Sequence, residues 1–496
     1  SSPSLIRRQL VAAMAALTFV GSPLGPGLGT ADLRVPTFGR HAPWEAVATK
    51  TAWKPCSTTG LCFATALTLR AVTRRRARAQ PSLPRRARGG EEVTLQPQDQ
   101  WIQQLDLEKF GKEVHELGQK LKAEQDQKDV KHLHKIVLWS RLCAVLGLGT
   151  MWMSPPNFIS IIFLSLWTHS AWTMMGHHAC HGGYNRTDLS GRFSSRGFAL
   201  GSLKRRVQDW FDWMLPEAWS IEHNQLHHYR LSEDGDPDLL ERNSQDWSKS
   251  ERMILPFVSM LVWKWAYYAP NTYKELKLSE MRNKNIPLPK NFDPQKPLTL
   301  GDLVAGEGKG VLSLGELFTK VMGPYFIFRF FLLPLPLIFF GSAFYMNAIC
   351  NLFLADILSN IHGFIVVVPN HAGNDLYRFQ RSCKPKSPTF YLRAITSSVN
   401  FDTGSDVNDF MHGWLNYQIE HHCWPDLSML SYQKGQAELK EICARHGVPY
   451  VQENVFVRLK KTLDIAMGRT KMRRYPDALE READMMVWQD QKQAAA

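Results

Sequence analysis

Acidic residues are almost absent from the first 90 residues of this 496-residue chain. Only Asp32 and Glu45 stand there against 14 lysines and arginines, so this segment has a net charge of +12. Because the whole chain has a charge of +13, the other 406 residues contribute only +1. The basic charge therefore belongs to one end of the chain rather than to a binding face, and we expect no nucleic-acid partner.

The same segment lacks apolar periodicity and is rich in Arg, Ser, Thr, Ala, Pro and Gly. This composition is typical of organelle transit peptides. We therefore expect residues 1–90 to direct the protein to a plastid (chloroplast), or otherwise to a mitochondrion or the endoplasmic reticulum. Two other interpretations stay open. The segment could be a disordered basic tail, or Arg7 and Arg8 could precede a signal-like apolar stretch at 10–20.

Several common motifs are missing as well. None of the eight cysteines belongs to a Cys-x-x-Cys pair, so the pattern predicts no disulfide framework. No Gly-rich dinucleotide fingerprint occurs, and the glycines at 306–310 lack the spacing of a phosphate-binding loop. The acidic run at 233–238 lacks the twelve-residue calcium pattern. We expect that run to be a loop beside a nearby histidine cluster.

Long apolar stretches are the main positive feature. Four of them, at 136–153, 158–175, 325–340 and 343–368, form two closely spaced pairs, although Arg329, Pro334 and Pro336 interrupt the third. A membrane-spanning helix needs roughly 17 to 25 residues. We therefore predict a mainly α, polytopic membrane protein with about four transmembrane helices in two hairpins. A helical cap would then contain the histidine clusters.

Two further stretches are predicted to be amphipathic helices. Residues 91–135 are polar and have apolar residues at near-helical spacing. This segment is expected to lie at the membrane surface or to pack on the body of the protein. Residues 253–268 are apolar but short and include Lys264. They favour an interfacial or re-entrant helix.

Eight of the 17 histidines lie in three short clusters. In chain order these are His177-His178-Ala-Cys-His181, His223-Asn-Gln-Leu-His227-His228 and Gln418-Ile-Glu-His421-His422. The first follows the second apolar stretch, and the third follows the fourth. Two hairpins would place all three clusters on the same side of the membrane, near its boundary.

The spacing within each cluster suits metal ligation. In an α-helix, residues i and i+4 lie about 40° apart on one face. Each cluster can therefore direct two side chains to one point: His177 with His181, His223 with His227, and Gln418 with His422. Neutral imidazole is a good ligand for Fe, Zn, Cu and Ni. A zinc site is complete with four ligands, so eight clustered histidines favour more than one metal ion.

The three histidine boxes, their order and their placement around two hairpins resemble the membrane fatty-acid desaturase family. The third box, with Gln418 in place of a first histidine, is similar to that of front-end desaturases, and residues 416–425 match that group closely. The second box is closer to the acyl-lipid desaturases of cyanobacteria and plastids. The resemblance covers residues 136–457. Many front-end members begin with a fused cytochrome b5 domain marked by His-Pro-Gly-Gly, and that motif is missing here.

The resemblance implies a non-haem centre of two iron ions that uses O2 as co-substrate. It also implies a ligand late in the fourth helix, which we assign to His371, with His362 as the alternative. Asn370 could contribute through water. Gln418 is the expected catalytic-site residue that orients or hydrogen-bonds a ligand, and His178 and His412 are expected to be ligands or to lie beside them. The full expected ligand set is His177, His181, His223, His227, His228, His371, His421 and His422.

The implied reaction is the O2-dependent desaturation of the acyl chain of a lipid, which introduces a cis double bond. The expected partners are the membrane, its acyl lipids and an external electron donor, either ferredoxin or free cytochrome b5. A hydroxylase or ketolase on the same scaffold stays open, as does a non-enzymic histidine-rich metal-binding protein. The expected organisation is a targeting segment (1–90), a pre-membrane segment (91–135), a desaturase domain (136–457) and a polar C-terminal tail (458–496).

Overall fold

Helices make up most of the described chain. In this computed structural model the described residues are 95–200, 202–210 and 212–486, and all of them belong to one unit of the chain. The predicted targeting segment lies outside these residues. The two strands, β1 (Tyr377–Arg378) and β2 (Arg473–Arg474), contain two residues each and pair in parallel. The prediction of a mainly α fold is confirmed.

The pre-membrane segment packs on the body of the protein. After α2 (Trp101–Gln104), α3 (Leu107–Glu124) begins at Asp106, whose side chain accepts a hydrogen bond from the Lys109 backbone. The buried face of α3 lies against α16 (Pro388–Thr396) and α19 (Met429–His446). A glycine permits the close packing on α16, since a Cβ at Gly111 would lie 2.5 Å from Cα of Pro388. Of the two predicted positions for this segment, the structure shows the one on the body.

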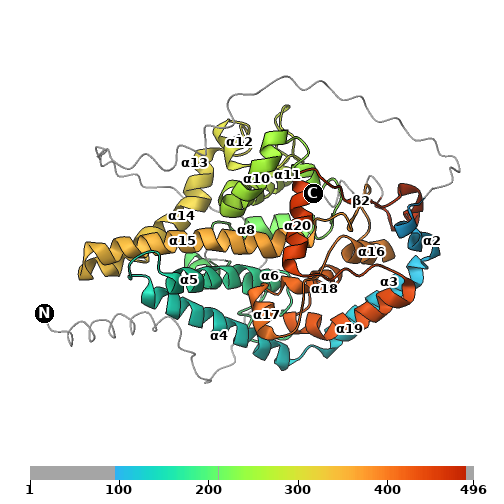
Figure 1. The fold of residues 1–496 in the computed structure, drawn as a ribbon, viewed down its shortest axis with the longest axis horizontal. Coiled ribbons are helices and arrows are strands. Elements are labelled where there is room, and N and C mark those ends of the chain that lie inside the picture. Colours follow the sequence, from blue (N-terminus) through green and yellow to red (C-terminus); the bar gives the residue numbers. More distant parts are fainter. Residues whose placement is uncertain (1–94, 201, 211, 487–496) are drawn as a thin grey trace. The chain divides into compact units, whose positions relative to one another are not determined.

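The first hairpin pairs α4 (Gln127–Thr150) with α5 (Phe158–Ser170), and the two helices lie side by side in Figure 1. A capping box of Asp126 and Asp129 starts α4. Its C-terminal half has exposed apolar side chains, including Leu142 and Val145. The second helix continues beyond α5 through a π-helical segment, η3 (Ala171–Gly176), into α6 (His177–Cys180). The first histidine box therefore lies at the end of a membrane-length helix.

The second hairpin is less regular in its first arm. That arm passes through α13 (Leu314–Leu317), η6 (Phe318–Met322), α14 (Gly323–Ile327), η7 (Phe328–Leu332) and η8 (Leu335–Phe340). The prolines that interrupted the predicted stretch coincide with the change from a π-helical segment to a 3-10 helix, because proline cannot donate a backbone hydrogen bond. The second arm is the long helix α15 (Ser342–Val367), followed by η9 (Val368–Asn370).

Three helices within the described residues are long and apolar enough to cross a membrane: Phe158–Cys180, Leu314–Phe340 and Ser342–Asn370. They contain the second, third and fourth predicted stretches. The first predicted stretch, 136–153, is not among these three helices. It begins inside α4, whose first turns are polar.

A buried ion pair connects the spans. The guanidinium of Arg329 on η7 donates to the carboxylate of Asp356 on α15 at 3.1 Å and to the Thr168 hydroxyl on α5 at 3.2 Å. Tyr325 and Trp213 also donate to Asp356, at 3.1 and 3.0 Å. Arg329, the charged residue that interrupted the third predicted stretch, therefore connects the two hairpins through its hydrogen bonds.

The middle of the chain forms a set of shorter helices. They are α7 (Leu203–Asp209), α8 (Pro216–Trp219), η4 (Ser220–His227), α9 (Leu240–Asn243), α10 (Lys249–Trp263), η5 (Lys264–Tyr268), α11 (Ala269–Asn283) and α12 (Leu300–Val304). The stretch predicted as an interfacial helix is α10 with η5. One face of α10 has exposed apolar side chains, while Lys264 is buried and bonded to Asp212 at 2.7 Å.

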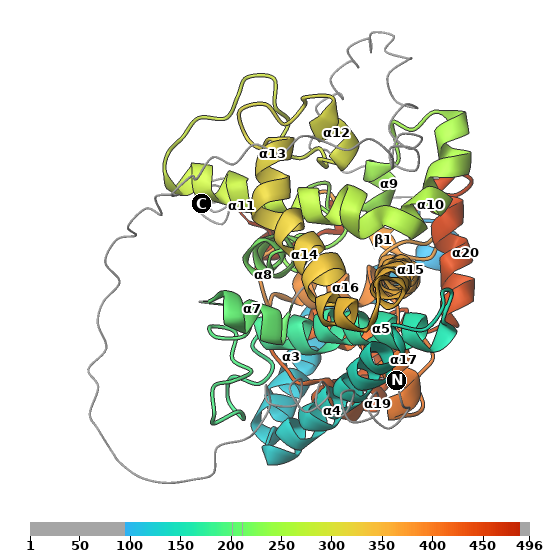
Figure 2. The same cartoon turned by 90° about the vertical axis from the view of Figure 1, so that its left-hand side faces the viewer.

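The C-terminal part contains α16, α17 (Asp406–Met411), α18 (Gln418–Cys423), α19 and α20 (Val455–Ala466). Figure 2 shows α20 beside α10, with α15 seen nearly end-on between α20 and α14. The segment predicted as a polar tail from residue 458 begins inside α20, where Arg458 is fully buried and bonded to Asp375.

Candidate metal centre

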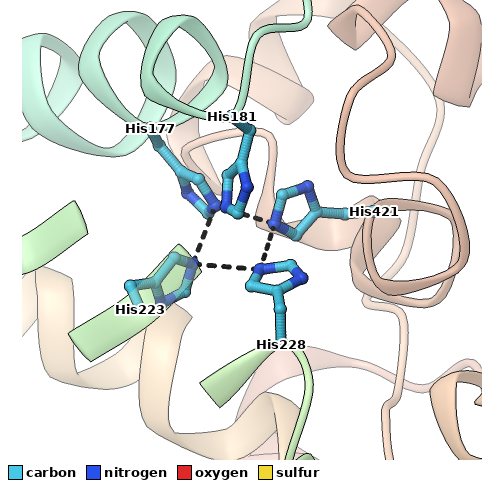
Figure 3. A group of neighbouring side chains, drawn as sticks. All are labelled: His177, His181, His223, His228 and His421. Carbon is cyan, nitrogen blue, oxygen red and sulfur yellow. Dashed lines mark hydrogen bonds between the residues drawn. The ribbon is translucent and has the colours of Figure 1, made fainter. Parts of the chain in front are cut away.

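Five histidines converge at the end of the membrane-length helix Phe158–Cys180. Figure 3 shows their rings pointing toward one another from three separate elements. Four Nε2 atoms form a closed circuit of contacts at 2.8 to 3.2 Å. The members of this five-histidine cluster are His177, His181, His223, His228 and His421.

A π-helical turn determines which residues of the second box share this cluster. The backbone N–H of His228 donates to the carbonyl of His223, five residues earlier, at 3.2 Å. In a π-helix residues i and i+5 lie on one face, and such turns occur frequently at functional sites. The Nε2 of His223 lies 3.2 Å from that of His228, a contact that the sequence-based pairing of His223 with His227 on an α-helix did not include. His223 and His227 also lie near each other, since together with Asp238 they have ligand atoms within 4.8 Å of one another.

A second cluster adjoins the first. It consists of His227, His371 and His422, whose ligand atoms lie within 4.8 Å of one another. The amide nitrogen of Gln418 lies 3.0 Å from the Nε2 atoms of both His371 and His422. A 180° flip of the Gln418 amide exchanges its nitrogen and oxygen, so the oxygen can face the two histidines instead. Gln418 thus supplies a fourth donor to this three-histidine cluster.

Adjacent histidines in the sequence divide between the two clusters. His227 belongs to the three-histidine cluster and His228 to the other, and the same holds for His422 and His421. Successive residues point about 100° apart on a helix, so a neighbouring pair can serve two different points. The rings of His228 and His422 stack at 4.3 Å between centroids, which places the two clusters side by side.

The environment keeps most of these rings neutral. Burial holds the pKa of His223, His228, His421 and His422 well below the ordinary histidine value, and neighbouring imidazoles lower it further. Burial lowers the pKa of His371 to about 3. Neutral imidazole is the form that binds metals.

His227 is the exception, and its partner is a carboxylate. Burial opposes a charge on this ring, but Asp236 and Asp238 together raise its pKa. Nδ1 of His227 donates to Asp236 at 2.9 Å, which leaves Nε2 free to face the cluster. A carboxylate that holds a ligating histidine in this way fixes the tautomer and ring orientation. The acidic run at 233–238 was expected to be a loop beside a histidine cluster, and the contact of Asp236 with His227 agrees with that expectation.

These residues fit bound metal ions. Nε2 of His181 is buried and has no hydrogen-bond partner among the described residues, and the same is true of the amide oxygen of Gln418 beside the three-histidine cluster. Unpaired polar atoms in a protein interior cost free energy. A cation at each cluster would satisfy the converging lone pairs. The donor set, eight imidazoles and one amide, is one that iron accepts.

Tyr432 and Ser397 were missed by sequence reasoning. Nδ1 of His421 lies 3.2 Å from the hydroxyl of Tyr432, and Nδ1 of His371 donates to the Ser397 carbonyl at 3.3 Å. Both contacts orient proposed ligands, from 11 residues after His421 and 26 residues after His371. No local pattern in the sequence marks either residue.

Four residues proposed as possible ligands or neighbours lie outside both clusters. His178 bonds the Met174 carbonyl at 2.8 Å and packs against His421. His362 stacks on His169 at 4.1 Å and bonds the Met411 carbonyl, while His412 bonds the Asn408 carbonyl. Asn370 bonds the carbonyls of Val366 and Leu415, which holds the chain just before His371.

A small cavity adjoins the two clusters. It is lined by His228 and His422 on one side and by Tyr229, Phe390 and Arg393 on the other. Its volume of about 10 Å³ is close to the space that one water molecule needs. The space next to one histidine from each cluster is therefore no larger than a water molecule.

The fold and the site define a helical membrane protein with a polyhistidine metal centre at the ends of its spans. Residues 152–454 match the family model for fatty acid desaturases. This match covers more than half of the chain, and the protein belongs to the fatty acid desaturase family.

Individual relatives are distant. An NADPH-dependent stearoyl-CoA 9-desaturase of Mycobacterium tuberculosis (strain ATCC 25618 / H37Rv) is 29% identical over 123 residues, which is 24% of this chain and 29% of the relative. A Delta(8)-fatty-acid desaturase of Euglena gracilis is 30% identical over 107 residues, 21% of this chain and 24% of the relative. Fatty acid desaturase 3 of Bos taurus is 21% identical over 315 residues, 61% of this chain and 59% of the relative.

In these three comparisons the matched part spans less than two thirds of the relative's length. No solved structure matches this chain.

Proposed function

We propose that this protein desaturates the acyl chain of a membrane lipid in an O2-dependent reaction and introduces a cis double bond of the front-end type. The observation that supports this proposal is the division of adjacent histidines between two clusters. It provides nine donors for two metal ions lying side by side, more than one ion needs. The three desaturases described above add support at the level of the family.

The ions that we propose for these clusters are two irons, one of the metals that imidazole ligands suit. When bound, they supply the activation of O2 that removal of hydrogen from an unactivated acyl chain requires. The protein's own groups hold the ligands in place. Asp236, Tyr432 and the Ser397 carbonyl orient the rings of His227, His421 and His371. Burial of the clusters excludes bulk water from the reacting centre.

The proposed substrate stays in the bilayer, because each CH2 of an acyl chain gains about 0.8 kcal/mol there. The clusters at the ends of the membrane-length helices are well placed to meet such a chain. Electrons would come from an external donor, with ferredoxin as our first proposal and free cytochrome b5 as the second.

Lipid profiling tests the reaction. Expression of the full chain in a host that lacks front-end desaturases should yield acyl chains with a new cis double bond on the carboxyl side of an existing one. The matched control is the same chain with His177→Ala, which removes a member of the five-histidine cluster. Hydroxylated or ketone-bearing chains without a new double bond would assign the protein to a different reaction on the same scaffold.

We also propose that residues 1–90 form an organelle-targeting segment, on the basis of their net charge of +12. A fluorescent protein fused to this segment should enter plastids, or otherwise mitochondria. Replacing Arg74, Arg75, Arg76 and Arg78 with glutamine should reduce import, because the proposed signal depends on arginine. Diffuse cytosolic fluorescence of the unaltered fusion would contradict the proposal.

A further inference from the structure

A basic cavity of about 520 Å³ lies apart from the metal centre, between the start of α10 and the end of α20. Ligand-binding pockets typically enclose about 300 to 1,000 Å³. Apolar side chains of Ile465 and Met472 line part of this cavity, and both belong to a small buried core. The ionisable side chains that line it are Arg252, Arg378, Lys471, Arg474 and Glu241.

Arg252 is fixed in place by neutral groups and has no ion-pair partner in the described part of the chain. Its guanidinium donates to the backbone carbonyls of Gln245 at 2.9 Å and Trp247 at 3.1 Å, and to that of Ala466 at 3.4 Å. Neutral carbonyls orient the guanidinium but leave its positive charge uncompensated. A planar guanidinium held in this way is suited to recognising a phosphate or carboxylate.

Gly468 makes room for this arrangement. A Cβ at this position would lie 2.5 Å from Nη1 of Arg252, and the residue has a φ of +69°, which favours glycine. The sequence at the end of α20 therefore permits the guanidinium to lie against the backbone. Any larger residue would displace it.

The other cations differ in their partners. Arg378 is compensated, because it donates to Glu241 at 3.0 Å and to Asp234 at 2.5 Å. Lys471 and Arg474 are exposed and have no ion-pair partner among the residues that the structure describes. Three cations that line one cavity thus have no ion-pair partner among the described residues, and an anion bound in the cavity would be attracted by each of them.

The cavity adjoins an apolar helix face. Immediately after Arg252, α10 exposes Met253, Ile254, Phe257, Val258 and Leu261, each at least 40% exposed. Their spacing places them on one side of the helix. Such a face next to basic residues is typical of helices that lie at a membrane surface, where apolar side chains meet acyl chains and cations meet headgroups.

We propose that this cavity is a phospholipid-binding site, in which Arg252, Lys471 and Arg474 bind the phosphate of the headgroup and the apolar face of α10 contacts the acyl chains. The site would hold a membrane lipid at the polar end of α10. This proposal goes beyond desaturation and does not depend on it, since binding at this cavity involves no metal ligand.

Binding of fluorescent phosphatidylglycerol to the purified full-length protein in neutral detergent tests the proposal. The double variant Lys471→Glu/Arg474→Glu should bind at least about tenfold more weakly, because two charge-assisted contacts become repulsive. The matched control is Lys460→Glu/Arg469→Glu. It changes the charge equally at two exposed cations on and just after α20 that pair with Asp464 and do not line the cavity. The control should bind like the unaltered protein.

Gly468→Ala provides a second variant that leaves the charge unchanged. It should also weaken binding, because the added Cβ displaces Arg252. Equal binding by the cavity variant, the control variant and Gly468→Ala would overturn the proposal.

Competition identifies the source of the phosphate. Soluble pyrophosphate and free coenzyme A should displace the lipid only at far higher concentrations than unlabelled phosphatidylglycerol, because they lack acyl chains that contact α10. If coenzyme A displaces it more effectively, and the cavity variant loses binding of coenzyme A, the lipid assignment is wrong.

Discussion

Replacing His422 with alanine is expected to abolish desaturation and to lower the iron content from about two ions per chain to about one. His422 lies in the three-histidine cluster, where its Nε2 is 3.2 Å from that of His371 and 3.0 Å from the Gln418 amide nitrogen. Loss of a partner that merely orients a ligand typically costs 10- to 100-fold. Loss of the ligand itself should reduce activity by more than about 100-fold. Product analysis and elemental analysis of the purified protein measure the two effects.

The control for this substitution is His412→Ala. This histidine lies close in sequence to the third box, but its ring bonds the Asn408 carbonyl at 2.8 Å and belongs to neither cluster. Its variant should retain the iron and most of the activity. His362→Ala tests whether His371 or His362 is the ligand near the end of the fourth helix. We expect this variant to keep its iron, because His362 stacks on His169 while His371 belongs to the three-histidine cluster. A His362 variant without iron, together with an active His371→Ala variant, would reverse that assignment.

Asp356→Leu is expected to destabilise the protein by about 3–5 kcal/mol, the usual cost of leaving one partner of a buried ion pair alone. Arg329 is 3% exposed and would lose its carboxylate, and the donors of Tyr325 and Trp213 would lose their acceptor. The network joins three membrane-length helices, so its loss should loosen both hairpins. Denaturation of the purified protein in detergent measures the effect.

Two further variants define the cause. The double variant Arg329→Leu/Asp356→Leu should recover more than half of the lost stability, because it removes the unpaired charge together with its partner. Lys112→Ala removes an exposed pair with Glu116, whose atoms lie 3.8 Å apart, and should change stability by less than about 0.5 kcal/mol. If the single and double Asp356 variants were equally unstable, the loss would come from packing rather than from charge.

Local sequence patterns were sufficient to predict much of this fold. Apolar stretches of membrane length identified the helices Phe158–Cys180 and Ser342–Asn370, because a spanning helix must satisfy its own backbone and bury a continuous apolar surface. The spacing of Phe110, Val114, Leu117 and Leu121 predicted α3 through its helical period. The sequence could not decide whether α3 lies at the membrane surface or packs on the body of the protein, because its apolar face could be buried in either place.

Arg329 and His227 show where the sequence was insufficient. Arg329 interrupted an apolar stretch, and only the folded chain brings it to Asp356, 27 residues later on the opposite arm of the hairpin. His227 was expected to pair with His223 on an α-helix. It does lie near His223, but it also meets His371 and His422, which are far along the chain. A π-helical turn depends on tertiary packing, so the i, i+4 rule could not reveal it.

The sequence by itself determined the helical class, the three histidine boxes and the expectation of a histidine-rich metal site, because each depends on residues that are close together in the chain. The tertiary structure alone decided how the ligands divide into five and three, which residues orient them, and that Arg252, Lys471 and Arg474 line one cavity. These features depend on elements separated by up to about 250 residues, such as His177 and His421. Only the packing of the helices determines which of their side chains meet.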